Sequence, residues 1–261
     1  MNINVIGLLG VALSIVAFQV TWLALRRRKL AARLAAALAS AAMAIPALLF
    51  AAYYLHVLPE WEWFYTLRSW PGSELLAIFL GCAGGALAAL LPRWLAVVPL
   101  FAAVALAVVP YVKPILGPLP DSIFSDNWRG DACLQSTAST CGPASVCTIL
   151  RRLNVEVSER TAAHAAFSYT GGTEAWYLAR YVRSHGFAAR FRFGETFSPS
   201  FGLPAVVGVR LGGVGHFIAV LAVQGDEVTY ADPLRGEEHT SLVQFQKRYV
   251  FTGFHMVVSK T

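Results

Sequence analysis

Charged side chains are scarce in this sequence. They make up 14% of its 261 residues, whereas 56% are hydrophobic, and a water-soluble domain is usually about 25% charged. This shortage excludes a chain that is soluble along its whole length. The apolar excess is confined to the first 116 residues or so. The remainder has the composition of a globular domain that is large enough for one core.

Cysteine is rare as well. The chain has 4 cysteines, and the spacings between Cys133, Cys141 and Cys147 are not those of the close CxxC pairs that hold zinc. We therefore expect no metal site and no cofactor. Cys133 and Cys147 are either two buried thiols or, in an oxidising compartment, a disulfide that leaves Cys141 free. The net charge of +6 does not predict nucleic-acid binding, because much of it lies at residues 26–33, where membrane topology explains it.

The first half of the chain predicts four transmembrane helices. Four apolar runs, each close to the roughly 20 residues that cross a bilayer, lie at about 3–25, 34–58, 74–91 and 94–112. No basic residue precedes the first run, so we predict an uncleaved span rather than a signal peptide. Gly81 and Gly85 form a GxxxG pattern, which is typical of closely packed helices.

Basic residues predict how these helices are oriented. The first loop carries Arg26–Lys29 and the third carries Arg93. The second loop carries Arg68 in a stretch rich in Trp and Tyr, which is typical of a membrane–water interface. The positive-inside rule puts loops one and three in the cytoplasm. After four spans the rest of the chain then lies outside, with residues 113–130 as an extended linker.

The residues that point to chemistry begin in the stretch 131–150. Loop-like residues end at Cys141, and Gly142 and Pro143 open an apolar helix pattern. A cysteine in the first turn of a helix faces unpaired N–H groups and the positive end of the helix dipole, which favours thiolate. Gln135, six positions upstream (141 − 135 = 6), can supply one oxyanion-hole donor and the Cys141 N–H another. Taken alone, the same pattern fits a buried cysteine at a helix start.

Downstream of Cys141, the pattern predicts helices first and antiparallel strands afterwards, which is an α+β domain over 131–261. The first helix runs to 153, Ser158 caps a second one, and Thr173 caps a third that Gly186 closes. Strands follow at 187–193, at 204–209, on either side of a QGDE hairpin turn, and at 254–259, with a short helix at 242–247.

His216 and Asp232 are the candidate partners of Cys141. His216 begins one strand of the predicted hairpin and Asp232 ends the other (232 − 216 = 16). Hairpin geometry brings the start of one strand beside the end of the next. A carboxylate there would fix the imidazole tautomer so that the other ring nitrogen faces a thiol. Each residue alone also fits a structural role, and the rival carboxylate Asp226 is expected at a solvated hairpin tip.

An ordered set of motifs resembles the bacteriocin-processing cysteine peptidases, the papain-like family that removes double-glycine leader peptides. In the family's order they are QSTASTCGPAS, GGTEAWYLARYVRSHGFAARF, GHFIAVLAV, VTYADPLRG and SLVQFQKRY. The resemblance covers residues 133–259 and none of the apolar half. It implies a papain-like fold in which Cys141 is the nucleophile and His216 the general base and acid. Asp232 would orient the histidine, and Gln135 would donate to the oxyanion.

Two features depart from the best-known members. Thr140 stands where many have an acidic residue, which affects the expected substrate preference. Those members are fused to ABC exporters, whereas this sequence has no P-loop pattern GxxxxGK(S/T). We expect a four-helix transmembrane segment followed by an α+β papain-like cysteine peptidase domain. It would be anchored in a bacterial plasma membrane and act outside on membrane-near or exported peptides. The alternatives are a thiol acyltransferase acting on a lipid or lipoprotein, and a non-catalytic peptide-binding module.

Overall fold

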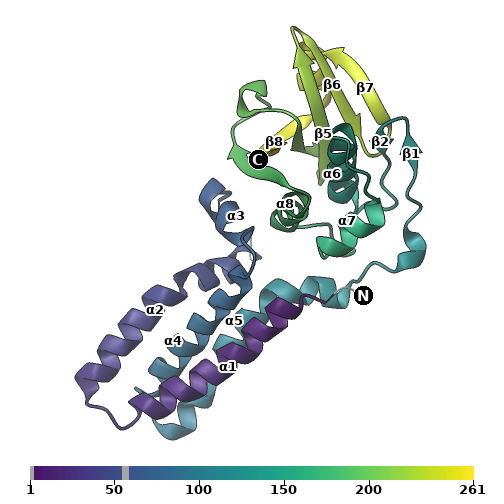
Figure 1. The fold of residues 1–261 in the computed structure, drawn as a ribbon. Helices are drawn as coiled ribbons and strands as arrows, with labels where there is room; N and C mark the ends of the chain where they lie inside the picture. Colours follow the sequence, from purple (N-terminus) through teal and green to yellow (C-terminus); the bar gives the residue numbers. More distant parts are fainter. Residues whose placement is uncertain (1–2, 55–58) are drawn as a thin grey trace. The chain divides into compact units, whose positions relative to one another are not determined.

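A computed structural model describes residues 3–54 and 59–261, and the expected second span therefore ends, at 55–58, outside the described residues. The chain separates into two compact units (Figure 1). The helical unit comprises 3–59 and 70–116, and the α/β unit comprises 60–69 and 117–261. Each unit is described by itself below.

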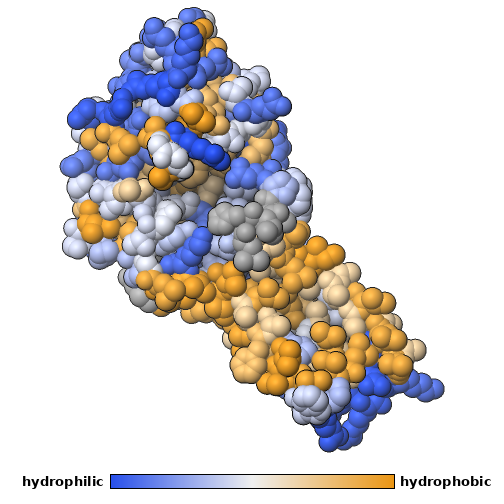
Figure 2. Space-filling view, turned by 180° about the vertical axis from the view of Figure 1, so that it is seen from behind, coloured by the Kyte–Doolittle hydropathy of each residue, from blue (hydrophilic) through white to orange (hydrophobic). Residues whose placement is uncertain are grey.

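The helical unit contains α1 (Val5–Leu25), α2 (Leu30–Tyr53), η1 (Ser73–Ala77), α4 (Ile78–Ala88), η2 (Arg93–Leu95) and α5 (Val97–Leu116). Within the described chain, three helices are long and apolar enough to cross a membrane: Val5–Leu25, Leu30–Tyr53 and Arg93–Leu116. The expected third span is instead a shorter pair, η1 and α4. It reaches the required length only together with Glu62–Arg68, from which it is bent by 101°. Hydrophobic residues cover most of the visible surface of the helical unit, apart from a hydrophilic end (Figure 2).

Glycines let α4 approach α1 closely. A Cβ on Gly81 would lie 1.9 Å from the Ser14 carbonyl oxygen, and one on Gly85 would lie 2.4 Å from that of Phe18. No side chain fits at either distance, so the close packing expected from the GxxxG pattern is confirmed. At the start of α1, Asn4 Nδ2 donates to Glu74 Oε1 of η1 (3.3 Å). At the other end of α4, Arg33 Nη1 of α2 donates to the Ala89 carbonyl (2.7 Å).

The α/β unit is built on a six-stranded antiparallel sheet of order β3-β8-β4-β5-β6-β7. Its strands are β3 (Phe187–Phe193), β4 (Ala205–Leu211), β5 (Val214–Gln224), β6 (Glu227–Asp232), β7 (Gly236–Ser241) and β8 (Val250–Lys260). A separate pair, β1 (Trp128–Arg129) and β2 (Ala132–Cys133), precedes the helices. The alternation at 187–193 predicts β3 with its observed bounds, whereas β7 has no apolar alternation to predict it.

Helices cover the sheet and supply its core. They are α6 (Cys141–Arg152), α7 (Glu159–Ala165), α8 (Ala175–Ser184) and α9 (Leu242–Arg248). Helix α6 packs against β5, and Phe245 of α9 closes a core with Val207 and Ile218. Ser158 caps α7 as expected, in a capping box with Thr161. Thr173 does not cap α8: Glu174 holds the N-cap position, and the Thr173 hydroxyl bonds Ser168 and the Ser139 carbonyl instead.

Two further segments belong to the α/β unit. Helix α3 (Glu62–Arg68) packs against α8 and β3, although the sequence predicts only an interfacial loop there. Residues 113–116 of the expected linker are helical, and its later part packs on the domain through Leu119 and Phe124. The Thr170 N–H also donates to the Gly117 carbonyl (2.8 Å).

Candidate active site

Cys141 is the first residue of α6, and its side chain is only 8% exposed. Because the first turn of a helix leaves backbone N–H groups without intrahelical partners, the thiol lies at the positive end of α6. The residue that follows, Gly142, has little space for a side chain. A Cβ on Gly142 would lie 2.8 Å from Leu178 Cδ1 and 3.2 Å from Phe217 Cδ2. The N-terminus of α6 is therefore packed tightly between α8 and β5.

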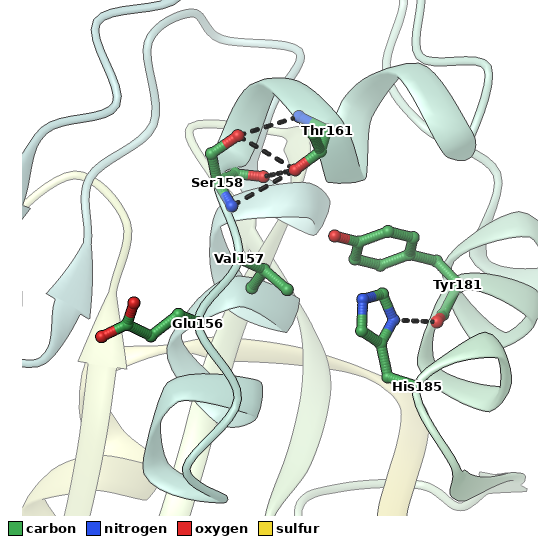
Figure 3. A pocket seen from close by; sticks show the side chains of 6 residues that line it. All are labelled: Glu156, Val157, Ser158, Thr161, Tyr181 and His185. Atoms are coloured by element: carbon green, nitrogen blue, oxygen red, sulfur yellow. Dashed lines mark hydrogen bonds between the residues drawn. The ribbon is translucent and has the colours of Figure 1, made fainter.

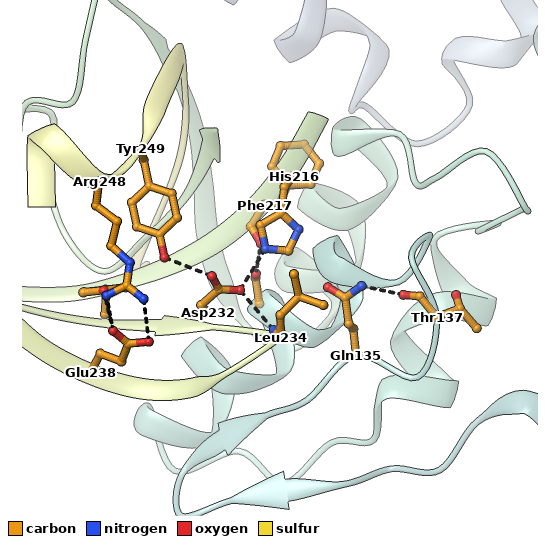
Figure 4. Close-up of polar contacts among 11 residues, drawn as sticks. Gln135, Thr137, His216, Phe217, Asp232, Leu234, Glu238, Arg248 and Tyr249 are labelled. Carbon is orange, nitrogen blue, oxygen red and sulfur yellow. Dashed lines mark hydrogen bonds and ion pairs between the residues drawn. The ribbon is translucent and has the colours of Figure 1, made fainter. Parts of the chain in front are cut away.

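His216 and Asp232 meet as the hairpin predicts (Figure 4). The imidazole Nε2 lies 2.9 Å from Asp232 Oδ1, and both side chains are almost fully buried. With Nε2 donating to the carboxylate, Nδ1 is the ring nitrogen left for the thiol. Burial opposes charge on His216, but the hydrogen bonds with Asp232 and with Cys141 outweigh it and raise the pKa of His216 to about 9. The imidazolium is therefore favoured at neutral pH.

The Asp232 carboxylate accepts two further hydrogen bonds. The Leu234 N–H donates to Oδ1 (3.0 Å), and the Tyr249 hydroxyl donates to Oδ2 (2.9 Å). Burial alone would raise the pKa of Asp232, but the hydrogen bonds with His216, Leu234 and Tyr249 lower it. Asp232 is thus held ionised behind His216. Tyr249 ends the SLVQFQKRY motif, and nothing in the sequence pattern distinguishes it as a partner of Asp232.

Gln135 lies on the loop before α6 (Figure 4). Its Nε2 donates to the Thr137 carbonyl (2.7 Å), and its backbone N–H donates to the Pro233 carbonyl (2.9 Å), next to Asp232. Its Oε1 is buried without a hydrogen-bond partner among the described residues. The buried Glu159 accepts from the Ser136 N–H (2.7 Å) and from the Ser136 hydroxyl, and so fixes the loop. The bond to Thr137 uses only one of the two Nε2 hydrogens.

The remaining cysteines and carboxylates are separate from this centre. Cys133 and Cys147 are fully buried free thiols, and burial, followed by the contact with Cys133, raises the pKa of Cys147. Asp226 lies exposed at the hairpin tip, as expected. No group of three or more His, Cys, Asp or Glu residues suited to a metal ion is found in the described part of the chain.

A shallow cavity of about 600 Å³ lies elsewhere, against α7 and α8 (Figure 3). Tyr181 and His185 of α8 face Ser158 and Thr161 across it. None of its lining residues is a candidate catalytic residue. The cavity therefore adds nothing to the Cys141 site.

Comparison with known proteins decides the family. The model of the peptidase C39 family matches residues 129–261. The chain belongs to the peptidase C39 family. This confirms the resemblance drawn from the ordered motifs, and the matched region contains Cys141, His216, Asp232 and Gln135.

Individual proteins similar to this chain are distant in sequence. An uncharacterised protein of Methanothermobacter marburgensis is 34% identical over 126 residues, which are 48% of this chain and 86% of that protein. The probable functional amyloid protease FapD of Pseudomonas aeruginosa is 30% identical over 126 residues, 45% of this chain and 56% of that one. The peptidase domain of Streptococcus ComA, a bi-functional ABC transporter, aligns with a TM-score of 0.42 at 18% identity. It covers 49% of this chain and 96% of that domain.

Proposed function

We propose that this C39 protein is a membrane-anchored cysteine peptidase that acts through Cys141, His216 and Asp232. One observation carries the proposal: a histidine whose Nε2 is 2.9 Å from a buried carboxylate and whose pKa is raised partly by a cysteine at a helix N-terminus. A nucleophile, a base and an orienting group in this relation are the parts of a thiol peptidase. Three such parts, drawn from α6, β5 and β6, meet in one place.

The chemistry follows from these positions. The Cys141 sulfur attacks the scissile carbonyl carbon, and a C–S bond forms while the carbonyl oxygen becomes an oxyanion. The Gln135 amide and the Cys141 N–H stabilise that oxyanion. The His216 imidazolium gives its proton to the leaving amine as the C–N bond breaks. Water, deprotonated by His216, then releases the carboxylic acid and restores the thiol.

A parity argument supports four membrane spans. Residues 60–69 and 117–261 form one α/β unit, and a unit with exposed loops and polar backbone stays outside the hydrocarbon core. Between residues 69 and 117 the chain must therefore cross the membrane an even number of times. Because α5 is long and apolar enough to cross, we infer that η1 and α4 cross with it as a span shorter than the other three. Glu74 contacts Asn4 at the start of α1, and Ala89, just after α4, contacts Arg33 in the first turn of α2; these contacts at opposite ends of η1–α4 agree with a full crossing.

The same contacts bear on orientation. Arg33, close to the Arg26–Lys29 loop, bonds the end of α4 just before Arg93. The basic loops thus share one end of the helical unit, and the positive-inside rule makes that end cytoplasmic. The α/β unit is then periplasmic or extracellular. Tethering there raises the effective concentration of membrane-near and exported peptides as substrates, and the name of the FapD relative fits a protein substrate.

Peptide termini test this proposal. Membrane and secreted fractions from cells with the wild-type protein, with Cys141→Ala and with Asp226→Asn are compared by mass spectrometry of new N-termini. We expect termini that depend on Cys141 and that persist in Asp226→Asn, whose substitution lies at the exposed hairpin tip. New amides or esters in place of new termini would assign the thiol to acyl transfer. Identical spectra for the wild type and Cys141→Ala would refute catalysis.

A further inference from the structure

Helix α3 contributes aromatic rings to the core of the α/β unit. Tyr65 is 3% exposed and lies in an aromatic cluster with Trp176 (ring centroids 5.5 Å apart), Phe191 (5.3 Å), Phe193 (5.1 Å) and Phe254 (5.9 Å). These rings come from α8, β3 and β8. A residue from between two expected membrane spans thus completes a cluster whose other members lie more than 100 positions later in the sequence.

The end of α3 is fixed to α8 by polar contacts. Arg68 is 1% exposed, and its Nη2 donates to the Tyr177 hydroxyl (3.3 Å). In return, Arg180 Nη2 donates to the Arg68 carbonyl (2.8 Å), and Arg183 Nη1 donates to the Ser69 hydroxyl (2.7 Å). Arginine side chains of α8 therefore satisfy carbonyls that the C-terminus of α3 leaves without helical partners.

The aromatic cluster extends to the catalytic centre through one more ring. Phe254 lies 5.2 Å from Phe217, the residue after His216. The Phe217 ring abuts Gly142, the residue after Cys141, and the Phe217 carbonyl accepts a hydrogen bond from the Ser145 hydroxyl of α6 (3.2 Å). Two ring contacts, Tyr65 with Phe254 and Phe254 with Phe217, thus connect α3 to the residues next to His216 and Cys141.

A second route passes through α8. Trp176 and Tyr177, which contact Tyr65 and Arg68, precede Leu178 in this helix. Leu178 also packs on Gly142, with its Cδ1 2.8 Å from the position of a Cβ there. Both structures that confine the start of α6 are therefore supported from α3. A close-packed interior transmits a displacement of either one, because it has no voids to absorb it.

We propose that residues 60–69 are a positioning segment of the active site, with Tyr65 and Arg68 as positioning residues for the Cys141–His216 pair. This inference rests on the proposed function. A segment that lies between apolar helices in the sequence thus supplies a wall of the α/β unit, and this wall holds the two reacting groups in register. Residues 117–261 alone lack this wall.

The test is the pH profile of Cys141 alkylation by iodoacetamide in the full-length protein, mapped by mass spectrometry. In a thiolate–imidazolium pair the thiolate persists at acidic pH, so the alkylation rate reaches a plateau there. A thiol without such a pair shows no plateau, because it is protonated at that pH. Tyr65→Leu and Arg68→Met are expected to lower the rate at pH 6 by about 10- to 100-fold, since a displacement of the order of 1 Å has effects of this size. Tyr65→Phe keeps the ring and removes the hydroxyl, which donates to Glu60 (3.1 Å), so it should keep the wild-type profile.

Trp63→Ala is the matched control, because Trp63 lies on α3 but is 51% exposed, and this variant should keep the plateau. A wild-type plateau in folded Tyr65→Leu and Arg68→Met would overturn the inference while leaving the proposed function intact. If neither of these variants unfolds cooperatively on heating, the segment is a folding element and the positioning role is refuted. Absence of the plateau in the wild type would instead refute the proposed function.

Discussion

Asp232→Asn separates the charge of the Asp232 side chain from its hydrogen bonds. Oδ1 accepts from both His216 and Leu234, whereas Oδ2 faces only the Tyr249 hydroxyl. An asparagine fits the same site with its oxygen toward His216 and its amide toward Tyr249, whose hydroxyl can turn to accept. The variant therefore keeps the imidazole tautomer. It loses only the negative charge that favours the imidazolium.

The pKa of His216 sets the size of the effect expected for Asp232→Asn. Its pKa of about 9 lies 2.5 above the value of 6.5 for an unperturbed histidine, which corresponds to about 3 kcal/mol in favour of the imidazolium. Without the carboxylate charge, the pKa falls toward 6.5. At pH 8 the protonated fraction of His216 then drops from about nine-tenths to as little as about a thirtieth. Asp232→Ala loses the orientation as well, which in triads of this kind costs up to about 10⁴-fold.

Two measurements follow this change. In the alkylation profile of Cys141, the step assigned to His216 should move from about pH 9 toward neutrality in Asp232→Asn. Thermal stability gives the second. Because the folded-state pKa of His216 is raised, its contribution to stability is fully present below about pH 6.5 and is lost as the pH rises through about 9. Asp232→Asn should flatten that alkaline loss. An unshifted step, or an asparagine variant as inactive as Asp232→Ala, would refute the reasoning.

Three further predictions concern the surroundings. Tyr249→Phe removes a buried donor to Asp232 Oδ2, and urea denaturation should show a loss of about 1–3 kcal/mol; an unchanged stability would contradict the role of this bond. Gly81→Leu would force a side chain against the Ser14 carbonyl, so the melting temperature of the protein in detergent should drop sharply. His255 is 1% exposed and its pKa is lowered, mainly by burial. Stability should therefore fall as the pH drops below about 6.5, because His255 is protonated in the unfolded chain there and stays neutral in the folded protein. His255→Phe should remove this pH dependence in thermal scans.

Controls for two of these variants lie at exposed positions. Ala39→Leu places a leucine at an exposed position of α2 and should leave the melting temperature in detergent unchanged. If it lowers the melting temperature as much as Gly81→Leu, the close approach of α1 and α4 is not the cause. Val250→Phe, at a position of β8 that is 66% exposed, should keep the acid sensitivity that His255→Phe removes.

Local patterns in the sequence predict those elements whose determinants are local. Strict alternation sets β3, and the hairpin turn pairs β5 with β6, which is why His216 and Asp232 are predicted as neighbours and are found 2.9 Å apart. The Ser158 cap follows from its own side chain. The cap predicted at Thr173 is wrong because its hydroxyl finds partners from another loop, and no local rule includes those partners.

Long-range contacts explain what the sequence does not predict. The stretch around α3 is rich in Trp and Tyr both because it borders apolar helices and because Tyr65 fills the core of the α/β unit. Aromatic residues are typical both of a membrane–water interface and of a protein core, and the sequence pattern alone does not distinguish the two. Tyr249 is missed for the same reason. Its hydroxyl reaches Asp232 from 17 positions away, and a tyrosine at the end of an amphipathic helix normally needs no such partner.

The central claim is that His216 activates Cys141 as a nucleophile, and the rate of Cys141 alkylation at pH 6 tests it most directly. An ordinary thiol is only about 0.3% thiolate at that pH. The wild-type protein should react about 10- to 100-fold faster than a small-molecule thiol of ordinary pKa, with the label on Cys141. His216→Ala should react no faster than that thiol. Equal rates for the wild type and His216→Ala would contradict the account.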